Sequence, residues 1–116
     1  MAIMRRGEVW VANLNPNKGG EVGKVRPVLV LQADAVTQTG LRTVLVVPLS
    51  RQYWRGLQPM RVRISARDRL GTDSWVMIEQ VRAIDRVRFG DGPLTTVSND
   101  EMTAVEKSLR AMLGIL

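Results

Sequence analysis

Hydrophobic residues along this chain follow two different periods. Up to about residue 90 they alternate with polar residues or form short apolar runs, and turns rich in Gly, Asn and Pro separate these segments. Segment 8–14 (EVWVANL) alternates, whereas 27–32 (PVLVLQ) is typical of a buried strand. The predicted strands are 8–14, 27–32, 42–49, 60–65 and 75–81, with 86–89 as a short sixth.

From Ser98 onward the pattern becomes helical. Ser98 and Glu101 have the spacing of a capping box, and apolar residues then recur at helical spacing as far as Leu116. Many short strands followed by one amphipathic helix predict a mainly β fold, a small and strongly bent sheet or barrel with a C-terminal α-helix. A length of 116 residues fits a single domain, 1–116.

Composition excludes several classes of function. The chain has no cysteine, which excludes disulfides and thiolate chemistry and fits a cytoplasmic location. It has no histidine, the commonest general acid–base residue and metal ligand, and its carboxylates lack the spacing of paired ligands. We see no membrane span and no secretory signal. We therefore expect no metal, no cofactor and no membrane partner.

The charge balance indicates a polyanionic partner. Lysine and arginine outnumber aspartate and glutamate 17 to 11, a net charge of +6. The segment from residue 98 onward carries −1, so residues 1–97 carry +7. A basic body of this kind fits nucleic acid or an acidic protein, although arginines that only solvate the surface would produce the same balance.

One arginine stands at the start of a predicted core strand, where a charge is costly to bury. Pro27 favours an extended backbone at Arg26, so the side chain can point to the exposed end of the strand, beside the glycine-bearing loop 19–24. In that position Arg26 can hold a ligand. The structural alternative is an ion pair between Arg26 and an acid such as Glu21 or Glu79.

Ser50 closes the third predicted strand and precedes a polar loop. A lone serine at a strand end is usually only a turn-former, and without a histidine to activate it a nucleophilic role is improbable. Donation of a hydrogen bond from the hydroxyl to a phosphate oxygen is chemically easier.

Two polar residues, Glu79 and Gln80, interrupt the apolar strand predicted at 75–81. On a pleated strand they point to opposite faces, so one of them can lie beside a cleft. The alternative is an edge position where either is simply in contact with water.

Two aromatic residues, Tyr53 and Trp54, lie between arginines in the loop after Ser50. Aromatics interleaved with arginines can stack unpaired bases. Trp54 can equally anchor the loop on the core, and that role is slightly favoured.

Five segments, in this order, resemble the MazF/PemK/Kid family of toxin endoribonucleases. They are RRGEVWVANL, a glycine-containing loop with Glu21, KVRPVLVLQ, VVPLS and IEQVRAID. The likeness runs from about Arg6 to the C-terminal helix. Its most specific parts are the RGEVW start and the GKVRPVLV segment, which together are a strong signal.

This resemblance implies an SH3-like β-barrel of the CcdB/PemK type that forms a homodimer. It implies metal-independent cleavage of single-stranded RNA, a MazE-like antitoxin that covers the RNA groove, and operator DNA as a partner only together with the antitoxin. The family's central catalytic arginine corresponds to Arg26, and its strand-closing hydroxyl, usually threonine, to Ser50. An arginine and an aspartate that some members carry correspond to Met77 and Glu79, so that acid–base pair is not retained.

The residues and the resemblance together favour attack by the RNA's own 2′-OH on the neighbouring phosphorus. This route yields a 2′,3′-cyclic phosphate and a 5′-OH and needs neither a protein nucleophile nor a metal. Arg26 suits bidentate phosphate binding, Ser50 suits donation to a non-bridging oxygen, and Glu21 can position the 2′-OH or act as base. The expected RNA-binding residues are Lys24, Glu79, Gln80, Tyr53 and Trp54.

Two other functions share parts of this pattern. CcdB-type toxins use the same barrel to bind DNA gyrase without any chemistry, and a non-catalytic nucleic-acid-binding barrel would also be basic. The RPV segment that contains Arg26 favours the ribonuclease over the gyrase-binding toxin. The combination of Arg26 with Ser50 has no explanation in a protein that only binds nucleic acid.

Overall fold

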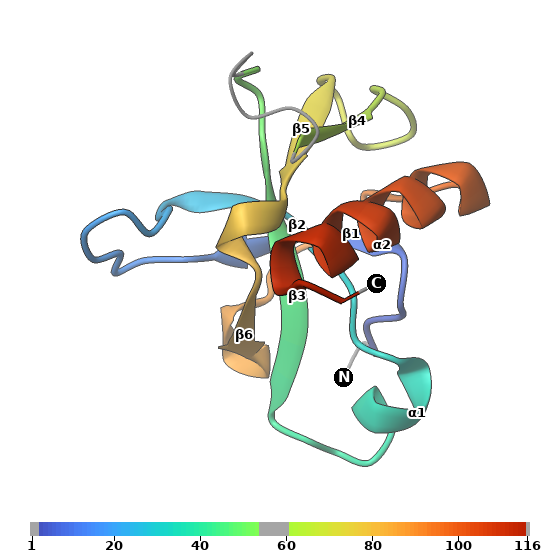
Figure 1. Ribbon diagram of the computed structural model, residues 1–116. Helices are drawn as coiled ribbons and strands as arrows, with labels where there is room; N and C mark the ends of the chain where they lie inside the picture. Colours follow the sequence, from blue (N-terminus) through green and yellow to red (C-terminus); the bar gives the residue numbers. More distant parts are fainter. Residues whose placement is uncertain (1–2, 54–60, 116) are drawn as a thin grey trace.

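Strand β3 (Thr43–Ser50) organises the fold because it pairs with three other strands along its length. It pairs with β6 through residues 43–46, with β2 through residues 46–48 and with β5 through residues 49–50, always antiparallel. A twisted strand that changes partners in this way curls its sheet. The result is a half-barrel with one long helix packed across it (Figure 1).

The computed structural model describes residues 3–53 and 61–115. The order of strands in the sheet is β4-β5-β3-β2-β1-β7, with β6 paired to β3. The other strands are β1 (Glu8–Asn13), β2 (Val25–Val30), β4 (Arg61–Ile64), β5 (Ser74–Met77), β6 (Arg82–Asp85) and β7 (Thr95–Thr96). The helices are α1 (Asp34–Thr37), α2 (Asn99–Leu113) and the 3-10 helices η2 (Ile78–Gln80) and η3 (Arg86–Arg88).

The apolar run in and after β2 is explained by burial on both faces of the sheet. Val28 and Val30 belong to one hydrophobic cluster, which also holds Trp10. Leu29 and Leu31 point the other way, into the cluster that contains the apolar side of α2. Because successive side chains of a strand point to opposite faces, a strand covered on both sides needs apolar residues throughout.

Helix α2 begins as its sequence predicts, but it ends at Leu113, before Leu116, where the predicted helical pattern ended. The side chain of Ser98 accepts a hydrogen bond from Glu101 N, and Glu101 accepts one from Ser98 N, which is the predicted capping box. The C-cap residue is Gly114, whose φ of +71° is the left-handed conformation that glycine adopts without strain. Met102 and Val105 are buried against the sheet. The prediction of a mainly β domain with a C-terminal helix is confirmed.

The second half of the sheet departs from the sequence prediction. The strand predicted at 75–81 ends at Met77, and Ile78–Gln80 forms the 3-10 helix η2. The strand predicted at 86–89 is wrong as well, since Arg86–Arg88 is a 3-10 helix. Strands β6 and β7 were not predicted, and neither was the short helix α1. The short strands β6 and β7 form because β3 and β1 supply partners for them, which local sequence does not reveal.

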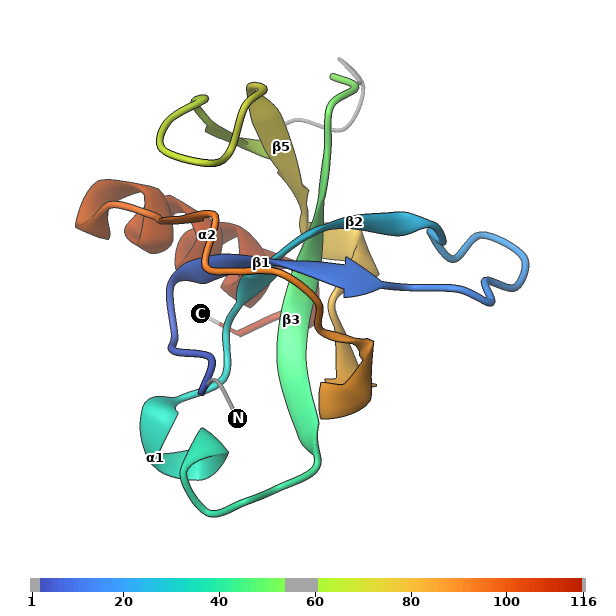
Figure 2. The same cartoon turned by 180° about the vertical axis from the view of Figure 1, so that it is seen from behind.

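The loop between β1 and β2 projects from the sheet when the molecule is seen from the front and from behind (Figure 1, Figure 2). It carries residues 14–24 and returns to the body of the protein at Arg26. This return brings the loop to the edge of the cavity described next.

Candidate functional site

Two backbone carbonyls orient the guanidinium of Arg26. The residue lies in β2 opposite Ala12, and it is partly buried. Its Nε donates to the carbonyl of Gly23 (2.9 Å), and its Nη1 donates to that of Leu49 (3.4 Å). Burial lowers the pKa of Arg26, but an arginine titrates so far above neutrality that the group keeps its charge. Of its five N–H groups, about three remain for a ligand.

The alternative role for Arg26, an ion pair with Glu21 or Glu79, is not found in the described part of the chain. Glu79 pairs instead with Arg61, at 2.7 Å. The carboxylate of Glu21 accepts a hydrogen bond from Lys18 N within the β1–β2 loop. Arg26 is therefore a cation held by peptide dipoles, with its charge not neutralised by a neighbouring acid.

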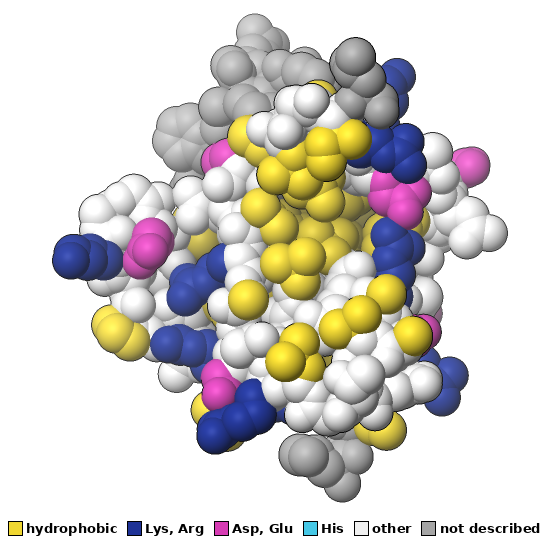
Figure 3. Space-filling view, turned by 60° about the horizontal axis from the view of Figure 1, so that its bottom comes forward, with side chains coloured by type: hydrophobic (Ala, Val, Ile, Leu, Met, Phe, Trp, Pro, Cys, Tyr) yellow, Lys and Arg dark blue, Asp and Glu magenta, His cyan; other side chains and the backbone are white. Residues whose placement is uncertain are grey.

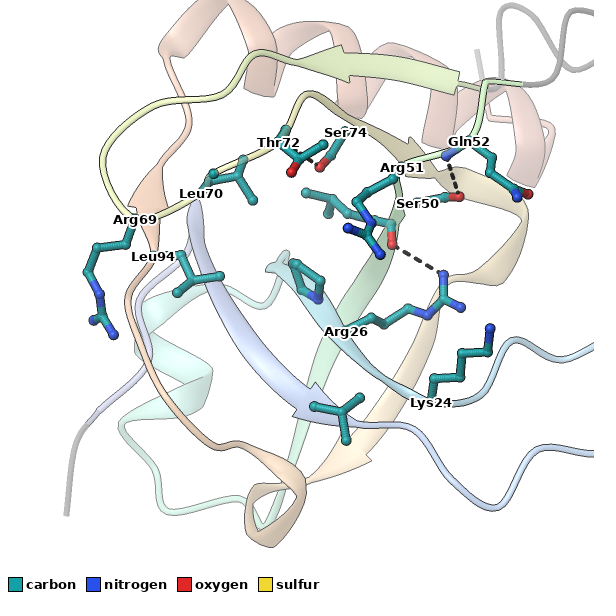
Figure 4. A pocket seen from close by; sticks show the side chains of 14 residues that line it. Lys24, Arg26, Ser50, Arg51, Gln52, Arg69, Leu70, Thr72, Ser74 and Leu94 are labelled. Atoms are coloured by element: carbon teal, nitrogen blue, oxygen red, sulfur yellow. Dashed lines mark hydrogen bonds between the residues drawn. The ribbon is translucent and has the colours of Figure 1, made fainter.

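Arg26 and Ser50 line the same cavity, which has a volume of about 480 Å³. Figure 4 shows the cavity between the start of β2, the end of β3 and the turn that joins β4 to β5. Its size is within the usual range for small-ligand sites. The lining residues are Lys24, Val25, Arg26, Pro27, Leu49, Ser50, Arg51, Gln52, Arg69, Leu70, Gly71, Thr72, Ser74 and Leu94.

Ser50 reaches this cavity from the last position of β3, opposite Trp75 of β5. Its hydroxyl oxygen accepts a hydrogen bond from Gln52 N (3.1 Å), which starts the turn after the strand. The bond uses a lone pair and leaves the hydroxyl proton for donation. Ser50 is thus both a turn-former and a donor at the cavity, beside the Leu49 carbonyl that accepts from Arg26.

The charged side chains that line the cavity are all positive. Lys24, Arg26, Arg51 and Arg69 contribute four cations, and none of the described lining residues is an acid. Arg69 also pairs with Asp91, away from the other three side chains. Cations gathered in a concave surface raise the local concentration of anionic ligands, so this site suits a phosphate backbone.

Two of the predicted site residues meet at the β1–β2 loop and do not line the cavity. Glu21 is exposed in the loop. Gln80, in η2, has its side-chain amide bonded to the same loop: Oε1 accepts from Val22 N (3.2 Å), and Nε2 donates to Gly20 O (3.1 Å). Their proposed roles toward RNA therefore stay predictions, and the structure adds a role for Gln80 in holding the loop.

Two further predicted RNA-binding residues, Glu79 and Tyr53, lie in η2 after β5 and in the loop after β3. Glu79 lies in η2, and its Oε1 is buried without a hydrogen-bond partner in the described structure, as are Nε and Nη1 of its partner Arg61. Tyr53 is exposed, and its ring packs against Trp75 with centroids 5.5 Å apart. Trp54 lies outside the described residues.

Sequence analysis did not find the far wall of the cavity. This wall consists of Arg69, Leu70, Gly71, Thr72, Ser74 and Leu94. These residues are separated from Arg26 by more than forty positions, and none belongs to the segments that carry the family resemblance. Only the pairing of β5 with β3 brings the turn beside Ser50.

No three side chains of His, Cys, Asp or Glu in the described ranges are grouped to hold a metal ion. Within the same ranges no helix is long and apolar enough to cross a membrane. The cavity offers guanidinium, ammonium and hydroxyl donors to a ligand, and its lining also includes apolar side chains such as Leu49 and Leu70.

The chain belongs to the family of PemK-like, MazF-like toxins of type II toxin–antitoxin systems, whose model matches residues 5–113. Among curated proteins it is 35% identical to endoribonuclease EndoA of Bacillus subtilis (strain 168). That match spans 98% of this chain and 97% of the relative. The predicted resemblance is confirmed, and the chain is a full-length homologue of an endoribonuclease.

Solved structures share the fold. MazF from Deinococcus radiodurans superimposes with a TM-score of 0.86 at 24% identity, covering 99% of this chain and 100% of that one. An endoribonuclease in complex with its cognate antitoxin, from a mycobacterial species, has a TM-score of 0.75 at 21% identity, covering 100% and 98%. A MazE–MazF complex from D. radiodurans has a TM-score of 0.78 at 23% identity, covering 99% and 100%.

Proposed function

We propose that this protein is the toxin of a type II toxin–antitoxin pair and cleaves single-stranded RNA. The observation that carries the proposal is the meeting of Arg26 and Ser50 in one cavity lined by cations, in a chain of this toxin family. A phosphodiester brings the negative charge that such a lining attracts, and an unpaired strand can enter where a duplex cannot.

The proposed reaction uses the RNA's own 2′-OH as nucleophile. A bond forms between the 2′ oxygen and phosphorus while the bond from phosphorus to the 5′ oxygen breaks. The 2′-OH proton is lost, and the leaving 5′ oxygen gains a proton. The products are a 2′,3′-cyclic phosphate and a 5′-OH end, with no cofactor or metal required.

Arg26 and Ser50 are the proposed catalytic residues at the phosphate. The unengaged N–H groups of Arg26 can donate two parallel hydrogen bonds to the non-bridging oxygens, where negative charge grows in the transition state. The hydroxyl of Ser50 donates to the same group. Glu21, which is exposed in the β1–β2 loop, is retained as the candidate for positioning the 2′-OH or for acting as base.

Other residues are proposed to hold the RNA on either side. Lys24 and Arg51 flank Arg26 in the cavity and suit neighbouring phosphates. The exposed ring of Tyr53 can stack on a base, with Trp54 beside it in sequence. Glu79, whose side chain is partly exposed beside its ion pair with Arg61, is retained as a candidate for accepting from a base edge.

Proposed protein partners follow from the relatives and from the surface. Two of the similar structures contain the toxin with its cognate antitoxin or MazE, so we propose a MazE-like antitoxin for this chain, with operator DNA bound only by that complex. One face gathers hydrophobic side chains in a hollow, with basic side chains on both sides of it (Figure 3). An exposed apolar surface of this kind is commonly covered by a partner, which supports the proposed homodimer.

The test is incubation of the purified protein with a long single-stranded RNA in EDTA, followed by mapping of the ends. We expect discrete cuts with 2′,3′-cyclic phosphate and 5′-OH ends, and no cut at a site carrying a single 2′-O-methyl group. DNA should be bound but left intact. Cleavage that survives the 2′-O-methyl group would overturn the mechanism. RNA left whole would favour a toxin that acts by binding gyrase, or a barrel that only binds nucleic acid.

A further inference from the structure

The loop that leads into Arg26 is fastened from outside by one side chain. Gln80 of η2 uses both ends of its amide on this loop, accepting from Val22 N and donating to Gly20 O, at 3.2 and 3.1 Å. The two partners are 58 and 60 positions away in sequence. An amide with its donor and acceptor both engaged by backbone is an anchor for that backbone.

One peptide bond separates this anchor from the carbonyl that orients Arg26. Val22 is bonded to Gln80, and the carbonyl of the next residue, Gly23, accepts from Nε of Arg26 at 2.9 Å. Gln80 therefore lies at one end, and the guanidinium at the other, of a short path that runs through two hydrogen bonds and the backbone of Val22 and Gly23.

The peptide between Gly23 and Lys24 is also held on its N–H side. Lys24 N donates to Oδ1 of Asn15 (2.8 Å), and Lys24 has a φ of +72°, which is unusual for a residue with a side chain. A Cβ at Gly23 would lie 2.5 Å from Oδ1 of Asn17. Backbone strain of this kind persists only where surrounding contacts hold it in place.

We infer that Gln80 is a positioning residue for Arg26: it holds Val22 and Gly23 so that the Gly23 carbonyl sets the direction of the guanidinium toward the phosphate. The inference rests on the proposed function, since it concerns the arginine of the proposed RNA-cleavage site. It differs from direct base reading by Gln80, because here the amide acts through its two hydrogen bonds to the loop and not through a contact with the RNA.

The first test needs no RNA. Gln80→Met keeps the length of the side chain and removes both hydrogen bonds, and Gln38→Met is the matched control at an exposed glutamine after α1. We expect NMR to show faster solvent exchange of the Val22 amide and of the Arg26 Nε–H in Gln80→Met, with both unchanged in Gln38→Met. Unchanged exchange of the Arg26 Nε–H in Gln80→Met would overturn the inference.

The second test separates positioning from base reading. A misplaced catalytic group can cost about 100-fold in rate, so we expect kcat of Gln80→Met to fall by about 10- to 100-fold while KM changes by less than about threefold. Gln80→Glu can still accept from Val22 N but cannot donate to Gly20 O. Its kcat should therefore lie between those of the wild type and Gln80→Met. Gln38→Met should equal the wild type.

The fall in kcat of Gln80→Met should be the same for RNA substrates that differ in the bases flanking the cut. A loss confined to RNA with one particular base would mean that Gln80 reads that base, and it would overturn the inference. Undiminished kcat in Gln80→Met would do the same while leaving the ribonuclease proposal intact. If the wild type fails to cut any RNA, the proposed function is wrong. The NMR exchange of the Arg26 Nε–H still tests whether Gln80 holds the contact between the loop and Arg26.

Discussion

Two arginines in different elements, Arg26 in β2 and Arg67 in the turn between β4 and β5, show how differently the same side chain is used. Arg67, in the turn between β4 and β5, forms a two-pronged ion pair with Glu101 of α2, including Nη1 to Oε1 at 2.9 Å. The hydrogen bonds that Arg67 donates to Glu101 raise the pKa of Arg67, whereas burial lowers the pKa of Arg26. Arg67 is neutralised and joins two elements, while Arg26 is left charged at a cavity.

The difference between the partners of Arg67 and Arg26 shows how one fold uses some arginines for stability and others for binding. A guanidinium with a carboxylate partner contributes to folding and has little left to offer a ligand. A guanidinium held by carbonyls alone remains unneutralised, and a phosphate can supply the missing charge. We therefore expect changes at Arg26 to affect cleavage and changes at Arg67 or Glu101 to affect stability.

The largest effect is expected from Arg26→Ala. Loss of a charged donor to the transition state should lower cleavage by about 1,000-fold, while the free energy of unfolding changes by less than about 1 kcal/mol, because no ion pair is broken. Initial rates on a defined RNA and urea denaturation measure the two quantities. The matched control is Arg42→Ala, at an arginine that is 80% exposed and paired with Asp85, which should leave the rate unchanged. Wild-type activity in Arg26→Ala would remove this residue from the site.

The next effect is expected at Ser50. Ser50→Ala removes one hydrogen-bond donor to a charged group and should lower cleavage by about 10- to 100-fold. Ser50→Thr keeps the hydroxyl and should restore most of the rate. Single-turnover cleavage of the same RNA measures both variants. Equal rates in the Ala and Thr variants would show that the hydroxyl has no part in the reaction.

A smaller effect, on stability alone, is expected at the junction of α2 with the β4–β5 turn. Glu101→Ala removes the capping box and the partner of Arg67 and should cost about 2 kcal/mol of unfolding free energy. Glu101→Gln keeps the cap and loses the charge, so its cost should be about half as large. Urea denaturation gives both values. A large fall in the cleavage rate of either folded variant would contradict the separation of the two regions.

The smallest effect is the pH dependence of that same pair. Burial acts to raise the pKa of Glu101, but hydrogen bonds from Arg67 and Ser98 outweigh it and leave the pKa below its usual value. The stabilisation is therefore complete above the unfolded pKa, about 4.3, and is lost as pH falls through the lower folded pKa. The difference in unfolding free energy between wild type and Glu101→Gln should be constant near neutral pH and shrink below about pH 4. A difference that grows on acidification would contradict this assignment.

Much of this fold could be predicted because its signals are local. The apolar runs predicted β1, β2 and β3, and the spacing of Ser98 and Glu101 predicted the start of α2. Arg26 drew attention because a charge next to Pro27 at the start of an apolar strand demands an explanation. Ser50 was singled out because it closes the third predicted strand, and the resemblance added the family's hydroxyl role; the cavity contains both residues.

The sequence predictions that were wrong or incomplete share one cause, which is contact between segments that are distant in the sequence. Residues 78–80 continue an apolar strand in sequence, yet Gln80 leaves the ladder and bonds to the β1–β2 loop. Leu94 and Thr72 reach the cavity only because the sheet curls. No periodicity predicts such partners, because their free energy comes from groups far away along the chain.

By itself, then, the sequence determined that no histidine or cysteine takes part in the chemistry. It also determined the alternation that builds the sheet, the cap that begins the helix and the position of an arginine at the start of a strand. Tertiary structure alone decided that this arginine has no acid as partner in the described chain, that Ser50, Lys24 and Arg51 line its cavity, and that an amide from η2 holds its loop. The physical reason is that local patterns set backbone conformation and burial, whereas the charge balance and direction of a side chain depend on which distant groups the folded chain brings beside it.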